Sequence, residues 1–489
     1  MQISSDSFKK TGLLHEQSLI GGEWRESATG HRISVSNPAT GSVIGSVPDM
    51  SFEETNQAIA AADKAQKGWA KRTAAERAAL LEAWFDLTMS KQQELGALMT
   101  AEQGKPLKEA MGEIAYAASF IKWFGEEARR VSGRTVPSPW PDRRIVTLKV
   151  PVGVCAIITP WNFPAAMITR KIAPALAAGC AVVIKPSELT PFTALALADL
   201  AEQAGIPAGV INVVTGMPTD IGAALTQSDT VRKLSFTGST RVGALLMAQS
   251  APTIKKLSLE LGGNAPFIVF DDADLEAAVD GCIASKFRNG GQTCVCSNRI
   301  LVQAGVYERF AEKLAAKVNA MRVGAGEAEG TEIGPMINAE AVAKINGHVQ
   351  DALALGAQIV GNRPTSPEGD TFVSPVVLKD ATAQMRLASE ETFGPVAALF
   401  RFETEQEAVA LANDTPFGLA AYFYTRDHAR AWRVGEELEA GLVGLNVGIM
   451  ACDVAPFGGV KQSGLGREGG TEGIEDFLET KAFHMGGLS

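Results

Sequence analysis

A cysteine in a glycine-rich loop has the setting in this sequence that most clearly suggests covalent chemistry. Cys294 ends the run Asn289-Gly290-Gly291-Gln292-Thr293-Cys294. The glycine pair permits a tight turn that can present the thiol in a cleft. An ordinary thiol is only roughly a few per cent thiolate at pH 7, so a nucleophilic Cys294 needs a helix N-terminus or a cation that lowers its pKa. Taken alone, the motif also fits a small, inert packed side chain.

Two other positions carry groups that could assist such a thiol. Glu260 lies in the apolar run 257–261, where a carboxylate is costly to bury unless it is paired or protonated. This setting predicts a raised pKa and a general base, with a buried salt bridge as the alternative. Asn162 lies in a loop between Pro160 and Pro164, whose rigidity suits an amide that donates a hydrogen bond to an oxyanion. An Asx-turn is the alternative for Asn162.

Two segments are candidates for binding a nucleotide. The run 185–188 follows an apolar strand, at the carboxyl edge where open α/β sheets bind ligands. Glu188 there could accept hydrogen bonds from ribose hydroxyls and would repel a 2′-phosphate, although a solvated capping loop is equally compatible. In the run 236–243 a strand meets a glycine and then a helix start, which could offer backbone N–H groups to a pyrophosphate. The Gly-x-Gly-x-x-Gly match at 464–469 lacks a following βαβ unit and is interpreted as a turn-rich loop.

The chain pattern predicts an α/β fold that could position these groups. Helical patterns cover 51–130, and apolar strands at 152–158, 181–184, 210–214, 233–236 and 257–261 alternate with helices. This alternation indicates a doubly covered parallel sheet. We expect a Rossmann-like cofactor domain (1–131 and 151–261) and an α/β catalytic domain (262–462). A small β oligomerisation arm (132–150) and a C-terminal segment (463–489) complete the expected organisation.

Composition excludes several classes of partner. A formal charge of −10 over 489 residues argues against nucleic acid or an anionic membrane surface as a partner. No apolar run approaches the roughly 20 residues of a membrane span, so a cytoplasmic location is expected. The six cysteines and five histidines are scattered, which favours reduced thiols and no metal site.

Four motifs, taken in order along the chain, resemble those of the aldehyde dehydrogenase superfamily. They are the 160–164 loop, the Glu260 strand, the Cys294 loop and the run Glu391-Thr392-Phe393-Gly394-Pro395. Within the superfamily, the segments 163–171, 285–289 and 290–296 are most similar to those of succinate-semialdehyde dehydrogenases. Glutarate semialdehyde is the nearest rival substrate.

The resemblance implies roles residue by residue. It gives Cys294 as the nucleophile, Glu260 as the general base, Asn162 as the oxyanion donor and Lys171 as a supporting cation. The cofactor residues that it implies are Trp161, Lys185, Ser187, Glu188, Gly238, Ser239, Glu391 and Phe393. For the substrate carboxylate it implies Arg170, Arg288 and the position of Ala451, near which relatives usually carry serine.

The implied activity is oxidation of a semialdehyde to its acid by way of a Cys294 thiohemiacetal and thioester. The implied cofactor is NAD, which Glu188 favours, with NADP as the alternative, and the implied assembly is a homodimer or homotetramer. A cysteine-dependent hydrolase and a catalytically silent structural protein are the competing classes, and NAD binding would separate them from a dehydrogenase.

Cys296 suggests regulation by oxidation, because it lies two residues beyond Cys294. An extended two-residue step spans about 6.6 to 7 Å, so a Cys294–Cys296 disulfide would require a local turn and would be strained. Strained disulfides are easily reduced, as a redox switch requires. Simple packing of Cys296 in the loop is the alternative.

Overall fold

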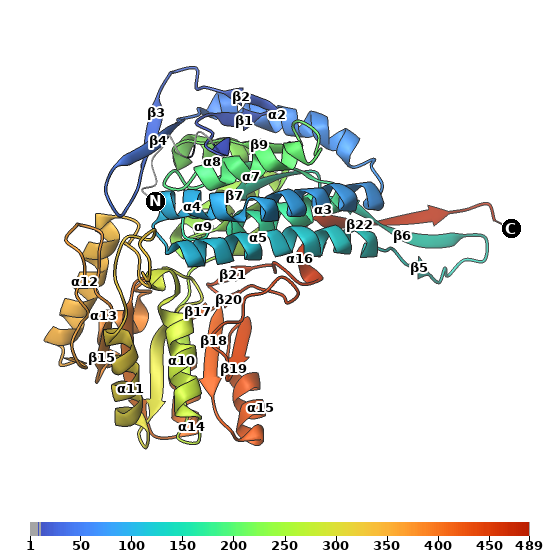
Figure 1. Ribbon diagram of the computed structural model, residues 1–489. Coiled ribbons are helices and arrows are strands. Elements are labelled where there is room, and N and C mark those ends of the chain that lie inside the picture. Colours follow the sequence, from blue (N-terminus) through green and yellow to red (C-terminus); the bar gives the residue numbers. More distant parts are fainter. Residues whose placement is uncertain (1–7, 9–10, 489) are drawn as a thin grey trace.

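The computed structural model describes Phe8 and residues 11–488, so the first residues of the expected cofactor domain and Ser489 lie outside this part. Two α/β bodies meet along one side, and a long β arm extends away from them (Figure 1). This arrangement confirms the predicted fold class. Within the described part, no helix is both long and apolar enough to cross a bilayer.

The first body is built on an eight-stranded sheet whose five central strands are parallel. Alternate residues of β7 and β8 enter two different cores: in β7, Cys155 packs with helices α3 to α7, and Ala156 packs with α2 and α8. In spatial order the strands are β2 (Glu23–Arg25), β1 (Ser18–Ile20), β9 (Ile211–Val213), β8 (Ala181–Lys185), β7 (Val154–Ile158), β10 (Val231–Thr237), β11 (Lys256–Glu260) and β21 (Gly464–Leu465).

Burial on both faces explains why β7 and β8 are almost continuously apolar. The helices of this body are α2 (Phe52–Trp69), α3 (Ala74–Ser90), α4 (Gln92–Gln103), α5 (Leu107–Glu127), α6 (Ala166–Ala178), α7 (Phe192–Gln203), α8 (Pro218–Gln227) and α9 (Thr240–Ser250). Helix α2 begins at a capping box in which Ser51 and Glu54 satisfy each other's backbone N–H groups.

The second body contains a seven-stranded sheet that is parallel except for β14 at its edge. Its strands, in spatial order, are β14 (Gln358–Ile359), β15 (Val376–Lys379), β16 (Val396–Phe402), β13 (Ser297–Gln303), β12 (Ala265–Val269), β18 (Ala420–Tyr424) and β19 (Leu442–Leu445). Its helices are α10 (Leu275–Lys286), α11 (Tyr307–Asn319), α12 (Ala339–Ala354), α13 (Arg386–Ser389), α14 (Glu405–Asn413) and α15 (His428–Glu437).

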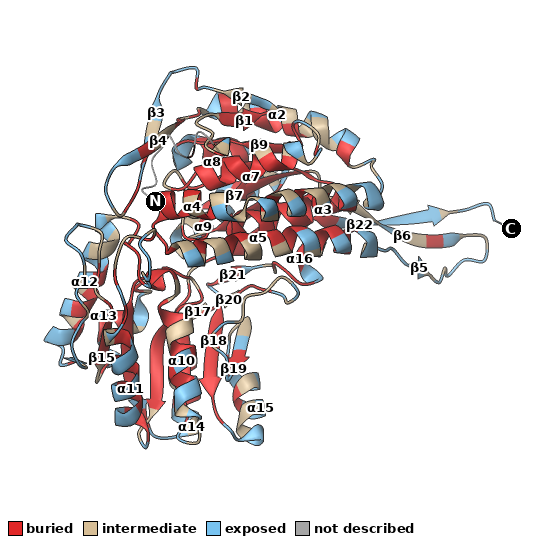
Figure 2. Cartoon of the chain, viewed as in Figure 1, coloured by how far each residue is buried: buried red, intermediate tan, exposed pale blue. Residues whose placement is uncertain are grey.

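The arm is a three-stranded antiparallel sheet of β5 (Thr135–Val136), β6 (Arg144–Pro151) and β22 (Leu478–Met485). It is mostly exposed, in contrast to the buried central strands (Figure 2). The remaining short elements are β3 (Arg32–Ser36), β4 (Val43–Pro48), β17 (Phe417–Gly418), β20 (Val460–Lys461) and α16 (Glu472–Glu475). The expected domain boundaries stay predictions, but β21, from the C-terminal segment, pairs with β11 in the large sheet rather than with the arm.

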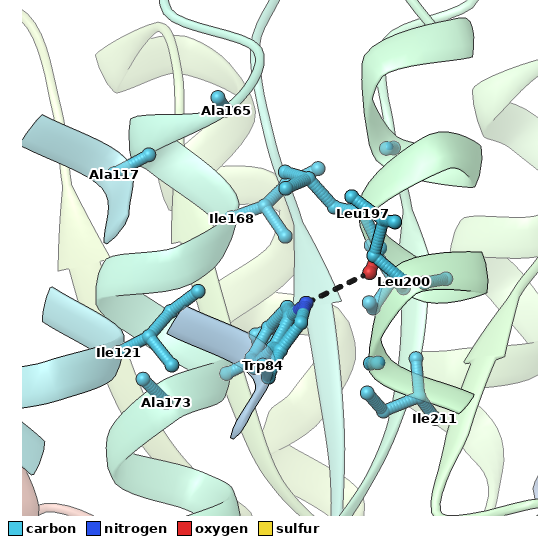
Figure 3. Close-up of a cluster of buried hydrophobic side chains, with 14 of the residues drawn as sticks. Trp84, Ala117, Ile121, Ala165, Ile168, Ala173, Leu197, Leu200 and Ile211 are labelled. Carbon is cyan, nitrogen blue, oxygen red and sulfur yellow. Dashed lines mark hydrogen bonds between the residues drawn. The ribbon is translucent and has the colours of Figure 1, made fainter. Parts of the chain in front are cut away.

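Trp84 lies at the centre of the largest core, between α5, α6 and α7 (Figure 3). Its side chain is fully buried, and its indole N–H donates to the carbonyl of Leu197 at 3.1 Å. This tryptophan therefore ties helix α3 to helix α7 behind the sheet that carries the site.

We predict that Trp84→Ala lowers the free energy of unfolding by about 3 to 5 kcal/mol, because it leaves a cavity and an unmade hydrogen bond. Trp432 is the matched control, since it is 74% exposed, and Trp432→Ala should change stability by less than about 0.5 kcal/mol. Denaturant midpoints followed by circular dichroism measure both. Similar losses for the two variants would contradict the role given to Trp84.

Candidate active site

A cavity of about 280 Å³ opens beyond the carboxyl ends of β7, β10 and β11, where the two bodies face each other. Sheet edges of this kind are the usual ligand sites of open α/β folds. Seven of the predicted site residues line this cavity: Trp161, Asn162, Gly238, Ser239, Cys294, Glu391 and Phe393. The fold thus brings residues separated by more than 200 positions to one cleft.

The turn before Cys294 depends on three consecutive residues in the left-handed region. Asn289, Gly290 and Gly291 have φ values of 52°, 61° and 77°. A Cβ atom on Gly291 would lie 2.3 Å from the carbonyl oxygen of Gly394, so this position tolerates only glycine. The turn presents the half-buried Cys294 thiol to the cavity.

Asn162 is held beside this turn by a buried network. Its Nδ2 atom donates to the backbone carbonyl of Gln292 at 3.0 Å. The backbone carbonyl of Asn162 accepts from Lys105 Nζ at 2.8 Å and from Asn289 Nδ2 at 2.9 Å. Lys105 also pairs with Glu113, whose carboxylate accepts from the backbone N–H groups at the start of α6. The sequence analysis missed Lys105 and Glu113, because only the fold brings them to the loop.

The environment of Cys294 differs from the sequence expectation that a cation lowers its pKa. Burial raises the pKa of the Cys294 thiol to about 12, and the nearby Glu391 carboxylate adds to the effect. Arg170 and Arg288 act in the opposite direction, but they do not outweigh burial. The expectation of a resting thiolate was therefore wrong, and nucleophilic attack requires that a proton be removed from a neutral thiol.

Glu260 ends β11 as a buried carboxyl group with no hydrogen-bond partner on either oxygen. Burial raises its pKa well above the ordinary value, and the carboxylate of Glu468 raises it further. Arg170 and Lys171 lower the pKa but do not reverse this shift. Burial therefore favours the protonated form of Glu260, as its place in an apolar strand had indicated.

Glu468 is the residue that organises this charge cluster. One of its oxygens binds Lys171, and the other lies 2.6 Å from Arg170 Nε in an ion pair that lacks hydrogen-bond alignment. Arg170 Nη2 also has no partner, so the guanidinium retains donor capacity although its side chain is buried. The sequence analysis missed Glu468 because it treated residues 464–469 only as a turn.

The residues expected to bind a nucleotide lie at the edge of the cavity and on the loop after β8. Trp161 and Phe393 meet edge to face at 5.6 Å, and Ser239 caps helix α9, whose N-terminus points at the cavity edge. Burial raises the pKa of Glu391 to about 7, and its Oε1 atom has no partner, so a ribose hydroxyl could satisfy it. On the loop after β8, Lys185 and Glu188 pair at 2.6 Å, next to the buried Ser187.

Helix α12 fixes the segment that carries Glu391. Lys344 Nζ donates to the Glu391 carbonyl at 2.6 Å. One turn later, the buried His348 contacts Glu390 Oε2 at 3.1 Å and Thr392 Oγ1 at 3.2 Å. These contacts hold Glu391 and the residues on both sides of it in place. No local sequence pattern predicted them.

The predicted substrate residues lie behind Cys294. Arg288 and Ala451 line one small cavity next to Val295, and the Arg288 guanidinium lies 5.2 Å from the Phe163 ring. Arg170 lies 3.9 Å from the Phe457 ring. Tyr116, which the sequence analysis missed, has a buried hydroxyl with no partner, and the charges of Arg170 and Arg288 both act on it.

The cysteines and the possible metal ligands complete the inventory of reactive side chains. All six cysteines are free thiols, including Cys294 and Cys296. Among residues 11–488, no group of His, Cys, Asp or Glu side chains could hold a metal ion. The site therefore offers a thiol, an amide and carboxylates as its reactive groups.

Comparisons with known proteins agree with this geometry. The model of the aldehyde dehydrogenase family matches residues 24–483. The succinate-semialdehyde dehydrogenase [NADP(+)] of Escherichia coli is 57% identical over 476 residues, which cover 97% of this chain and 99% of that protein. The glutarate-semialdehyde dehydrogenase of Pseudomonas aeruginosa is 56% identical over 480 residues, or 98% and 99% of the two chains.

A solved structure supports the same assignment. The succinate-semialdehyde dehydrogenase of Burkholderia pseudomallei superposes with a TM-score of 0.96 at 58% identity, covering 97% of this chain and 98% of that one. This chain belongs to the aldehyde dehydrogenase family, whose members oxidise aldehydes with NAD(P). Membership confirms the resemblance and sets aside the hydrolase and structural-protein alternatives.

The raised pKa of Cys294 generates a pH prediction for the cofactor-free enzyme. Only the thiolate reacts with iodoacetamide, so labelling of Cys294 should rise about tenfold per pH unit and keep rising beyond pH 9. Peptide mass spectrometry after timed labelling measures this rate. A plateau below pH 8 would show that the cations outweigh burial.

Proposed function

We propose that this enzyme oxidises succinate semialdehyde to succinate with NAD(P). The observation that carries the proposal is that Cys294 opens into the nucleotide cleft while two arginines lie behind it. A substrate with an aldehyde at one end and a carboxylate at the other matches this arrangement, because its aldehyde can reach the thiol while its carboxylate meets the arginines. Glutarate semialdehyde is the second candidate, favoured by the name of the Pseudomonas aeruginosa relative.

Cys294 acts as the nucleophile in the proposed mechanism. The neutral thiol loses its proton to water as sulfur adds to the aldehyde carbon, which gives a thiohemiacetal. The Asn162 amide donates to the resulting oxyanion, because its position is fixed by the Gln292 and Lys105 contacts. Trp161, Ser239, Glu391 and Phe393 would hold a nicotinamide cofactor, which would supply the hydride acceptor for oxidation of this carbon. The substrate would then remain on Cys294 as a thioester.

Glu260 completes the cycle as the base that activates water for thioester hydrolysis. It must first lose its own proton, and the raised pKa places that loss above its ordinary range. Lys171 supports the ionised form through its contact with Glu468. The proposed residues at the cofactor are Trp161, Lys185, Ser187, Glu188, Gly238, Ser239, Glu391 and Phe393, and the proposed residues at the substrate carboxylate are Arg170, Arg288 and Ala451.

For the finer properties we propose NAD as the preferred cofactor, because the Glu188 carboxylate would repel a 2′-phosphate. We also propose a homodimer or homotetramer joined through the arm. Its exposed apolar side chains Leu148 and Phe483 support this, since such groups favour a covered surface. Free thiols at all six cysteines favour a reducing compartment such as the cytoplasm.

The role of Glu260 predicts a burst. Glu260→Gln should form the acyl-enzyme but hydrolyse it slowly, giving about one NADH per active subunit and then little turnover. Stopped-flow absorbance at about 340 nm measures the burst. Cys294→Ala should show neither phase. Steady NADH formation without a burst in Glu260→Gln, with acylation still fast, would exclude Glu260 as this base.

The substrate assignment predicts a selective loss in Arg288→Ala. Removing a charge-assisted hydrogen bond of about 1.5 to 3 kcal/mol should lower kcat/KM for succinate semialdehyde by roughly 10- to 150-fold. Butanal lacks the carboxylate and serves as the control substrate, with a much smaller loss. Arg288 is a cleaner test than Arg170, whose loss would also release Glu468. Equal losses on both substrates would indicate a structural role.

The cofactor assignment predicts a shift in Glu188→Ser. Removing the carboxylate should raise kcat/KM with NADP relative to NAD, because the charge that opposes a 2′-phosphate is lost. Steady-state rates with both cofactors measure the ratio. A wild-type preference for NADP would contradict the proposed role of Glu188.

A further inference from the structure

A buried lysine next to the catalytic loop has no place in the mechanism above. Lys286 is the last residue of α10, and its side chain is fully buried. Its Nζ atom donates to the sulfur of Cys296 at 3.2 Å, and Cys296 is itself only 6% exposed. Lys286 and Cys296 therefore form a buried amine–thiol pair, and Cys296 lies two residues beyond the nucleophile.

The pairing is unusual because a buried ammonium normally requires a carboxylate. The buried Lys105 and Lys171 follow this rule, with Glu113 and Glu468 as partners, whereas the buried Lys233 donates to the Ser258 hydroxyl. Within the described part of the chain, no Asp or Glu forms an ion pair with Lys286, and its hydrogen-bond acceptor is a thiol. Stability alone does not account for such a pair, whereas an amine in contact with sulfur can react with it after oxidation.

We propose that Lys286 and Cys296 form a redox-sensitive modification site that closes into a sulfur–nitrogen cross-link. Hydrogen peroxide first oxidises the Cys296 thiol to a sulfenic acid: an S–O bond forms, the O–O bond breaks and water leaves. The Lys286 amine, after its ammonium loses a proton to water, then attacks that sulfur. The S–N bond forms, the S–O bond breaks, and the hydroxyl leaves as a second water with a proton from nitrogen.

The balance is one thiol, one amine and one peroxide giving a sulfenamide and two waters, a two-electron oxidation of sulfur. A dithiol reverses it, since two thiols become a disulfide while the amine and the Cys296 thiol are restored. The sulfur–nitrogen cross-link competes with the expected Cys294–Cys296 disulfide, because both products form from the same sulfenic acid at Cys296. The cross-link leaves Cys294 as a free thiol, and it does not depend on which semialdehyde is the substrate.

The test uses the full-length Cys294→Ala variant, in which the competing disulfide cannot form. The protein is treated with dilute peroxide, quenched, denatured, alkylated and digested with trypsin. Cross-linked Lys286 is no longer a trypsin site, so residues 257–288 should appear joined to residues 289–299 with the loss of two hydrogens. Dithiothreitol should restore cleavage after Lys286. Cys282, fully buried on the same helix, should remain alkylated throughout and serves as the internal control.

Lys286→Arg in the same background is the matched variant, since it keeps a cation but not the reactive amine. It should give no joined peptides and should over-oxidise Cys296 to sulfinic acid. If Lys286→Arg does not fold, the trypsin digestion pattern of Cys294→Ala is sufficient to test the cross-link. Complete cleavage after Lys286 with sulfinic acid at Cys296, or a wild-type enzyme that gives only the Cys294–Cys296 disulfide, would overturn the proposal.

Discussion

The buried carboxylate of Glu468 is the contact on which the arrangement of the site depends. It binds Lys171 and Arg170, two neighbours on α6, and its charge raises the pKa of Glu260 on β11. Buried charges are costly unless they are paired, so removing any member of this cluster leaves another uncompensated. The Glu468 backbone also pairs with Phe457, which ties the cluster to the loop behind the substrate pocket.

Burial acts on both reactive groups of the site. It raises the pKa of the Cys294 thiol to about 12 and raises the pKa of Glu260 well above its ordinary value, so it favours the uncharged form of each. A neutral thiol reacts with oxidants and alkylating agents more slowly than a thiolate does. The neighbouring Cys296 contacts Lys286 instead of the nucleophile, so the two thiols of one loop have different environments.

The sequence alone was sufficient to predict features that depend on residues close together in the chain. The parallel strands β7 and β8 follow from continuous apolar runs, and the glycines before Cys294 indicate a forced turn. Glu468 and His348 could not be identified from the sequence, because their partners are distant in the chain and no local sequence pattern connects them. The pKa of Cys294 was misjudged for a related reason: cations can be counted in a sequence, but burial is a property of the packed fold.

The pH dependence of thioester hydrolysis in Glu468→Gln tests this account most directly. Glu260 acts as a base only after deprotonation, so hydrolysis should rise with pH as its raised pKa is crossed. Removing the Glu468 charge should lower that pKa and shift the rise to lower pH, while Arg170 and Lys171 remain in place. Single-turnover rates of wild type and variant across the pH range provide the comparison. A rise at unchanged or higher pH in Glu468→Gln would contradict the claim that the Glu468 charge raises the pKa of Glu260.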